Sequence, residues 1–471
     1  MRFQGLCDDE TATNRLSLGW LVLAVASLVF AGLFALLVAL ARTPVIEEML
    51  PFGRDYINIG LVGHVILAVV IWFLAFQGFL WVAASASELK IRVWSPLLGW
   101  LAIGACCAGT VLVAVSALFG LGMAELVNYV PVLHTPVFYA GLLIFALGIL
   151  LHLFNTGLIL VFAVRSGKKL PTVTIGMAAA GLGVFVAFLC FALSAWFQLS
   201  TGKAFLDFER LFWGGGHILQ AVNTITMVTA WVYLSRIVYK EEPVGPRLAK
   251  ALYGLYLLFI IPAPVIYLLF DTSSQAHKDS FTMLMQWGLG PSTLVFGVAI
   301  ATMAVKKGAR GWGSAGFSSL VLSVFVFFIG GVIAMTISGV NTKIPAHYHC
   351  VIGAVTIAFM GLFYEMAPLL GRDIYSRRLA VLQPYLYSGG ILLFAAGLYI
   401  AGAHGVARKT YAGSQNLNTL GRLVGMSVMG AGGLVAISGG IAFVYNAVMT
   451  LGRGARQPVE ARETIVYEPV P

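Results

Sequence analysis

The sequence predicts an all-α integral membrane protein with twelve transmembrane helices. Three observations support this class. Of the 471 residues, 59% are hydrophobic and only 10% are charged; the mean hydropathy is +0.91; and stretches long enough to cross about 30 Å of hydrocarbon recur along the whole chain. Short loops between these stretches carry nearly all the charged residues. Such a composition excludes a soluble globular domain.

The expected spans follow one another without a long soluble insertion. They cover residues 17–42, 56–85, 93–121, 137–164, 172–199, 210–235, 248–270, 281–305, 314–339, 346–370, 379–404 and 423–451. We therefore expect one membrane domain over residues 17–452, a cytoplasmic N-terminal segment over 1–16 and a polar cytoplasmic tail over 453–471. The first span starts far from the N-terminus and lacks a small-residue cleavage site, which favours a retained helix over a signal peptide.

The distribution of Lys and Arg predicts the orientation in the inner membrane. Of the 29 Lys and Arg residues, 20 fall on the side of the two termini. The others are Arg42, Arg54, Lys203, Arg210, Lys278, Lys343, Arg408, Lys409 and Arg422. Because these residue types accumulate on the cytoplasmic side of short loops, both termini are expected in the cytoplasm. Topology thus explains the net charge of +10, and no nucleic-acid partner is expected.

Five ionisable residues are expected at one depth in the bilayer. His64 and His217 lie at similar distances into helices that enter from the outer side, and His347 and His349 are in the first turn of the tenth span. Asp271 lies where the seventh span leaves the membrane. An ionisable residue at the centre of a membrane helix costs about 2.5–3.5 kcal/mol, so residues of this kind are functional candidates. Their convergence favours one site over unrelated buried histidines.

The sharpest motif is AHYHCVIGA, residues 346–354. Helix positions i and i+2 are separated by about 200°, so His347 and His349 project from nearly opposite faces. A single metal held by one helix would favour a spacing of i, i+3 or i+4. The observed spacing suits two haems on either side of the helix, each with an axial imidazole. His64 can supply the second ligand of a low-spin haem.

A second motif, LFWGGGHILQAVN, covers residues 211–223. Its glycines permit a helix or macrocycle to approach closely just before His217, and Gln220 lies one turn further along the same face. Together with Asp271, His217 could form half of a non-haem metal site. An imidazole with a carboxylate is a harder ligand set than three imidazoles and favours iron, although copper stays an alternative.

With these residues the chain resembles the haem-copper oxidase superfamily, whose core subunit has twelve helices with ligands on helices two, six, seven and ten. The resemblance implies an oxidoreductase that binds two haems and a non-haem copper or iron. It also implies that His347 ligates the high-spin haem, that His64 and His349 ligate the low-spin haem, and that His217 ligates the non-haem metal.

The chain departs from the superfamily at helix seven, where members carry a pair of histidines for the non-haem metal. Phe270 and Asp271 occupy the corresponding positions. The expected ligand set is therefore His217 and Asp271 with Gln220 or His277. Two of the three usual metal-binding histidines are missing.

The active-site tyrosine of the oxygen reductases is also displaced. Its helix-six position is Gln220, and Tyr267 lies four residues before Asp271 instead of six. Nitric oxide reductases lack this tyrosine and place a carboxylate beside a non-haem iron. The resemblance thus indicates a divergent nitric oxide reductase, with Asp271 holding the metal and Gln220 donating a hydrogen bond to a bound oxygen. The alternatives are an oxygen reductase, a twelve-helix transporter and a non-catalytic dihaem electron-transfer subunit.

The remaining candidates are less specific. Glu125, Asn128 and Tyr129 could contribute to a calcium site, and Arg54 could pair with a haem propionate. His152 lies in the middle of the fourth span and has no assigned role. The five cysteines form no CxxC, CxxCH or CxxxC pair, so the chain has no c-type haem site of its own. We therefore expect a companion subunit with a c-type haem or a copper domain, or quinol as the donor, with the haem layer toward the periplasm.

Overall fold

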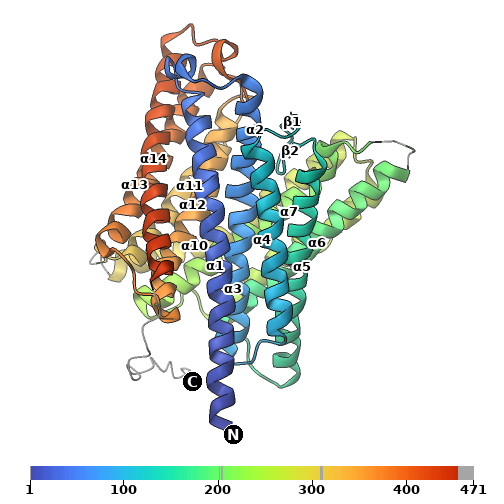
Figure 1. Ribbon diagram of the computed structural model, residues 1–471, viewed down its shortest axis with the longest axis vertical. Helices are drawn as coiled ribbons and strands as arrows, with labels where there is room; N and C mark the ends of the chain where they lie inside the picture. Colours follow the sequence, from blue (N-terminus) through green and yellow to red (C-terminus); the bar gives the residue numbers. More distant parts are fainter. Residues whose placement is uncertain (1, 201, 203–204, 308–310, 454–471) are drawn as a thin grey trace.

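The computed structural model describes residues 2–200, 202, 205–307 and 311–453. Within these residues, twelve helices are long and apolar enough to cross a membrane, which confirms the predicted fold class. The helices stand side by side in one elongated bundle (Figure 1). The tail expected over residues 453–471 lies outside the described residues except for Arg453.

The helices have the following bounds in chain order. They are α1 (Arg2–Leu40), α2 (Arg54–Val65), α3 (Trp72–Val82), α4 (Pro96–Leu118), α5 (Pro136–Arg165), α6 (Thr172–Ser200), α7 (Phe208–Tyr239), α8 (Pro246–Ile260), α9 (Ile266–Leu269), α10 (Gln275–Lys307), α11 (Ala315–Ala334), α12 (Lys343–Met366), α13 (Arg377–Ala403) and α14 (Leu420–Gly452). Two short strands, β1 (Ala124–Glu125) and β2 (Val132–Leu133), pair antiparallel between α4 and α5.

Several helices begin where the sequence supplies a cap. The side chains of Ser95, Asp207, Ser314, Ser376 and Thr419 each accept a hydrogen bond from the backbone amide three residues on. Such caps satisfy one of the amides that a helix start leaves without a partner. Proline opens α4, α5 and α8, where its missing N–H is no loss.

Two spans are less regular than the sequence indicates. The second combines α2 and α3 with π-helical segments at Ile66–Ile71 and Ala83–Ser87. The seventh is interrupted between α8 and α9, where Pro262 and Pro264 flank the start of a 3-10 turn. Proline removes a helical hydrogen bond and its ring clashes with the preceding turn, so a pair of prolines ends α8. In addition, α1 already begins at Arg2, within the segment expected to precede the first span.

The most buried spans are those that carry the predicted ligand histidines. In the most apolar window of each span, 83% of the residues are buried in α7, 78% in the span of α12 and 67% in the span of α2 and α3, against 33% in those of α8, α10 and α14. The spans of α2, α7 and α12 all start at the end of the bundle opposite the start of α1. Their histidines therefore lie in the core and toward that end.

Candidate haem and metal centre

The four histidines predicted as ligands share one orientation. In each, ring nitrogen Nδ1 lies within hydrogen-bond distance of a backbone carbonyl. The pairs are His64 with Ala31 at 3.1 Å, His217 with Trp213 at 2.8 Å, His347 with Gly330 at 2.8 Å and His349 with Pro345 at 2.7 Å. A carbonyl only accepts, so Nδ1 carries the proton and Nε2 presents a lone pair. Metal-ligating histidines commonly donate their other ring N–H in this way.

His152 has the opposite orientation. Its Nε2 donates to the carbonyl of Gly78 at 2.9 Å, and its ring centroid lies 4.4 Å from that of Trp20. Its Nδ1 is buried without a hydrogen-bond partner. This side chain links α5 to α3, and its contacts explain its place in the bundle without a metal.

The two histidines of α12 face different neighbours. His347 donates to Gly330 of α11, whereas the ring of His349 lies 4.7 Å from that of Phe394 of α13. His349 is also close enough to His64 for the two rings to interact electrostatically. The structure thus brings together the pair predicted for the low-spin haem and leaves His347 on a different side of the helix.

Arg42 fits the carboxylates of a haem better than the predicted Arg54. Its Nε and Nη2 are buried without a hydrogen-bond partner, it interacts electrostatically with His349, and its guanidinium lies 5.8 Å from the ring centroid of Tyr411. The hydroxyl of Tyr411 is also buried without a partner. Unpaired buried polar groups are unfavourable, and a propionate would satisfy them.

Arg54, in contrast, is exposed at the start of α2. From the sequence, Arg42 was the last residue of the first expected span, 17–42, and was counted only among the basic residues on the side away from the termini. A cation at the outer end of a span, at the depth of the histidines, is the signal that could have identified it.

On the other side of the centre, His217 contacts a residue from outside the helices. Its Nε2 lies 2.9 Å from the hydroxyl of Tyr129. Tyr129 belongs to the segment between β1 and β2. Burial, and to a lesser extent the carboxylate of Glu209, raise the pKa of Tyr129 above its ordinary value. The phenol is therefore protonated at neutral pH without a metal, and donates to His217.

The glycine run before His217 receives aromatic side chains. A Cβ added to Gly214 would lie 2.2 Å from the hydroxyl of Tyr267, and one added to Gly216 would lie 2.3 Å from Cγ of Tyr129. At Gly215 the neighbour is Phe191. The close approach of a helix expected from the sequence occurs at Gly215, where an added Cβ would lie 2.8 Å from the backbone carbonyl of Ala187 in α6. The rings of Tyr267 and Phe281 lie against Gly214, and that of Tyr129 lies against Gly216.

A second histidine lies near His217. His277, at the start of α10, is 1% exposed, and its charge would interact with that of His217. Its ring centroid lies 4.8 Å from that of Tyr267 and 5.1 Å from that of Phe281. The carbonyl of Phe270 is nearby, but neither ring nitrogen of His277 makes a hydrogen bond of normal geometry, and the hydroxyl of Tyr267 has no partner of normal geometry either. These donors are available to a ligand.

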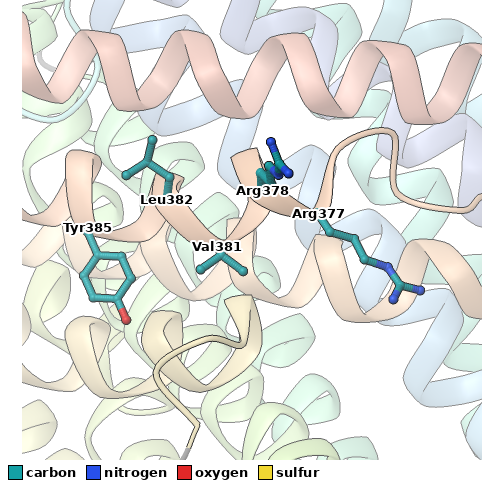
Figure 2. A pocket seen from close by; sticks show the side chains of 5 residues that line it. All are labelled: Arg377, Arg378, Val381, Leu382 and Tyr385. Carbon is teal, nitrogen blue, oxygen red and sulfur yellow. The ribbon is translucent and has the colours of Figure 1, made fainter.

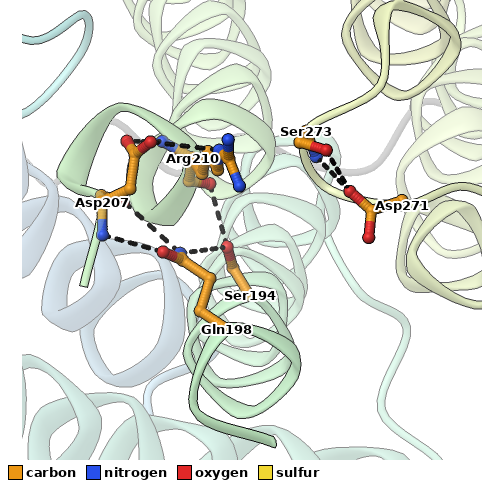
Figure 3. Close-up of polar contacts among 6 residues, drawn as sticks. All are labelled: Ser194, Gln198, Asp207, Arg210, Asp271 and Ser273. Carbon is orange, nitrogen blue, oxygen red and sulfur yellow. Dashed lines mark hydrogen bonds and ion pairs between the residues drawn. The ribbon is translucent and has the colours of Figure 1, made fainter. Parts of the chain in front are cut away.

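The structure does not bring Asp271 to His217. Its side chain is exposed in the turn after α9, and its Oδ1 accepts from the amide of Ser273 at 2.7 Å and from the Ser273 hydroxyl at 2.5 Å (Figure 3). The chain leaves the helix at Phe270, so Asp271 belongs to the loop. Within the described residues, no three His, Cys, Asp or Glu side chains gather closely enough to hold a metal ion.

The start of α7 is held in place by polar contacts with α6. Asp207 caps α7, and its amide donates to Oε1 of Gln198 at 2.8 Å. Ser194 donates to the carbonyl of Arg210 at 2.9 Å (Figure 3). These contacts fix the helix that presents His217. Further along it, Oε1 of Gln220 is buried without a partner.

The residues suggested for calcium do not share a site. Glu125 lies 2.8 Å from Nε2 of His134, and Asn128 donates to Glu209 through both its backbone and its side chain. Tyr129 contacts His217 instead. The geometry therefore offers no support for calcium binding by these three side chains.

A surface hollow of about 460 Å³ lies far from the histidines. It is lined by Arg377, Arg378, Val381, Leu382 and Tyr385 (Figure 2). These residues are in the first turns of α13, at the end of the bundle where α12 finishes. The histidines of α12 lie near the start of that helix, at the opposite end. The hollow is not part of the candidate centre.

Comparison with known proteins shows similarity over most of the chain. A family model described as Cytochrome C and Quinol oxidase polypeptide I matches residues 15–436. An uncharacterized protein of Aquifex aeolicus is 31% identical, covering 79% of this chain and 89% of the relative. One from Rickettsia prowazekii is 26% identical, covering 93% and 96%. Cytochrome c oxidase subunit 1 of Thermus thermophilus is 26% identical, covering 84% and 77%.

The fold is similar to that of a solved enzyme. A chain from the cryo-EM structure of a heme-copper terminal oxidase dimer matches with a TM-score of 0.75 and 20% identity, over 95% of this chain and 85% of that one. At this identity the likeness concerns the fold alone.

Proposed function

The chain belongs to the cytochrome c and quinol oxidase polypeptide I family of haem-copper oxidases, and we propose that it is the catalytic subunit of a membrane reductase that converts nitric oxide to nitrous oxide. The reaction is 2 NO + 2 e⁻ + 2 H⁺ → N₂O + H₂O. Family membership makes the protein an integral membrane oxidoreductase. The choice of nitric oxide depends on the metal side of the centre.

One observation carries this choice: the donors available around His217 are not those of a three-histidine copper site. Phe270 and Asp271 stand at the positions of the helix-seven pair, and Gln220 stands at that of the helix-six tyrosine. His277 is the second imidazole nearby. Imidazole combined with oxygen donors favours iron over copper, and a haem iron beside a non-haem iron is the metal pair of the nitric oxide reductases.

We assign the residues as follows. His64 and His349 hold the low-spin haem, His347 holds the high-spin haem, and His217 holds the non-haem metal with help from His277. When bound, the haems and the non-haem metal would relay electrons from the donor and polarise the substrate. The protein orients each imidazole through a backbone carbonyl and excludes water by the burial of α7 and α12.

Two polar residues have proposed roles near the substrate. Asp271 interacts electrostatically with His277, so we keep it as the carboxylate of the site, although its side chain must turn away from Ser273 to approach the ion. Gln220 has a buried amide oxygen without a partner, and its amide N–H can donate to an oxygen of the substrate. Both roles concern the binding and orientation of small polar molecules in a dry site.

The proposal also covers the electron donor and the orientation of the protein in the membrane. Core subunits of this family work with other subunits, and we expect the electrons to come from one with a c-type haem or copper domain, or from quinol. The excess of Lys and Arg on the side of the termini supports a cytoplasmic location for both ends. The haem layer would then face the periplasm.

Oxygen reduction is the second candidate, and specific observations favour it. The Thermus thermophilus relative is a cytochrome c oxidase subunit 1. Tyr267 and Tyr129 also bring two phenols close to the start of α7.

The purified complex with both haems loaded would distinguish these functions. With an artificial electron donor, we expect consumption of nitric oxide, measured by an NO electrode, with stoichiometric N₂O detected by gas chromatography. His217→Ala should abolish this activity while the low-spin haem spectrum is retained. Consumption of O₂ without consumption of NO would establish the oxygen reductase instead. Two irons with no third metal would refute a catalytic role.

A further inference from the structure

Tyr129 reaches the candidate metal centre from outside the helix bundle. Its hydroxyl lies 2.9 Å from Nε2 of His217, and the two ring centroids are 4.7 Å apart. Because Nδ1 of His217 is bonded to the carbonyl of Trp213, Nε2 is the nitrogen that would bind a metal. The phenol oxygen of Tyr129 therefore lies where that metal and its other ligands belong.

We propose that the phenol oxygen of Tyr129 is a ligand of the non-haem metal, alongside His217. Metal–donor bonds to nitrogen and oxygen are about 2.0–2.2 Å long, so two neighbouring donors at right angles on one ion are about 3 Å apart. The separation between Tyr129 and His217 matches this spacing. Coordination replaces the phenol proton, which is released as H⁺, because a bound cation deprotonates its ligands. The inference rests on the proposed function insofar as it requires a metal at His217.

The segment around Tyr129 is built to hold this position. Tyr129 has a left-handed backbone with φ of 68°, which is unfavourable for a bulky residue and is maintained only when the surroundings determine it. The preceding Asn128 donates to Glu209 from its amide and its side chain, and accepts from Arg408 at 3.0 Å. Glu209 belongs to the first turn of α7, so the helix that carries His217 also anchors the tyrosine.

Two further polar groups lie near His217. The ring nitrogens of His277 and the hydroxyl of Tyr267 are buried without a hydrogen bond of normal geometry, and backbone groups of Phe270 and Gly215, respectively, lie near them. The absence of a Cβ at Gly214 and Gly216 allows Tyr267 and Tyr129 to lie against the same turn of α7. Tyr129 would thus supply one donor in place of the histidine pair that helix seven lacks.

A second tyrosine–histidine pair supplies a matched control. The hydroxyl of Tyr139 lies 2.8 Å from Nδ1 of His134, but this pair is at the exposed rim, where His134 also contacts Glu125. It is an ordinary surface hydrogen bond. Tyr139→Phe therefore removes the same kind of contact without touching the centre.

The test compares wild-type holoenzyme with Tyr129→Phe, Tyr267→Phe and Tyr139→Phe. Metal content per protein is measured by mass spectrometry, and the oxidised enzymes are examined by resonance Raman spectroscopy after growth with unlabelled or ring-deuterated tyrosine. We expect a third metal in the wild type and tyrosinate ring modes that shift on deuteration. Tyr129→Phe should lose these modes and bind the third metal at least tenfold more weakly, with both haems retained. Tyr139→Phe should match the wild type, and Tyr267→Phe should keep the modes.

The possible results separate the two proposals. A wild-type protein without a third metal would overturn both the proposed function and the ligand role. A third metal without isotope-sensitive tyrosinate modes would overturn only the ligand role, and this measurement on the wild type is decisive even if Tyr129→Phe does not fold. Tyrosinate ring modes that persist in Tyr129→Phe and disappear in Tyr267→Phe would also overturn the ligand role of Tyr129.

Discussion

The proposed haem side of the candidate centre, around His64 and His349, and its proposed metal side, around His217, are built differently. On the haem side, His64 and His349 project from α2 and α12, and each is oriented by a carbonyl within the helices. On the metal side, donors near His217 come from the β1–β2 segment, from α9 and from the first turn of α10, and the seventh span is interrupted. The positions of the candidate haem ligands depend on their spacing within helices. The positions of the candidate metal ligands depend on contacts between separate segments of the chain.

This difference corresponds to what each proposed cofactor requires. Each proposed haem takes one axial imidazole from α12, and the i, i+2 spacing of His347 and His349 is sufficient to place both. A non-haem metal needs several donors at once, and these can come from any element that reaches the ion. The metal side can therefore exchange ligands while the fold is preserved.

The largest effect is expected from His349→Leu on the haem side. Removal of one axial imidazole of the low-spin pair should eliminate that haem, about half of the haem in the protein. Pyridine haemochrome and reduced-minus-oxidised spectra measure the loss. His134→Gln, at the exposed rim, is the control and should retain the full content. A low-spin spectrum that survives in His349→Leu would refute the assignment of α12.

Gly216→Ala tests whether the metal side depends on contacts between segments. The new Cβ would lie 2.3 Å from Cγ of Tyr129, so the ring must move away from His217. Overpacking of this kind costs about 1–3 kcal/mol, measured as a lower thermal midpoint in detergent together with a lower content of the third metal.

Gly254→Ala is the matched control because its Cβ would meet nothing within 4 Å. An equal loss in both variants would show that the effect comes from helix packing in general. Unchanged metal binding in Gly216→Ala would show that the Tyr129 position does not matter.

The same difference accounts for what the sequence could and could not predict. The twelve spans follow from hydropathy, and the structure agrees with them; the common depth of the histidines follows from helical spacing and stays a prediction. The approach of Tyr129 to His217 spans 88 positions in the chain, and no local pattern encodes it. Asp271 was expected just after the seventh span, 248–270, and it does follow the end of α9 there. Its side chain is bonded to the next turn at Ser273, a local contact that the spacing of the spans does not predict.

Arg42→Gln should have a moderate effect on the haem side. The guanidinium lies near His349 with two buried donors free, so its charge favours the reduced haem. Its loss should lower the midpoint potential of the low-spin haem by an amount on the order of 50 mV, consistent with a unit charge acting across a partly buried site. Spectroelectrochemical titration measures this shift.

Arg54→Gln is the comparison for that experiment. Arg54 is exposed, and solvent and salt screen exposed charges, so its removal should shift the potential much less. A larger shift in Arg54→Gln than in Arg42→Gln would restore Arg54 as the partner of the propionate.

The smallest effect is expected for His152→Leu. His152 belongs neither to the proposed haem side nor to the proposed metal side of the candidate centre. Because Nε2 of His152 donates to Gly78, the ring cannot offer that nitrogen to a metal, and both haems and the third metal should be retained. The substitution removes one buried hydrogen bond but also an unpaired Nδ1, so the free energy of unfolding should fall by only about 1 kcal/mol. Loss of a haem in this variant would contradict the use of ring orientation to separate ligands from structural histidines, and with it the assignment of both sides.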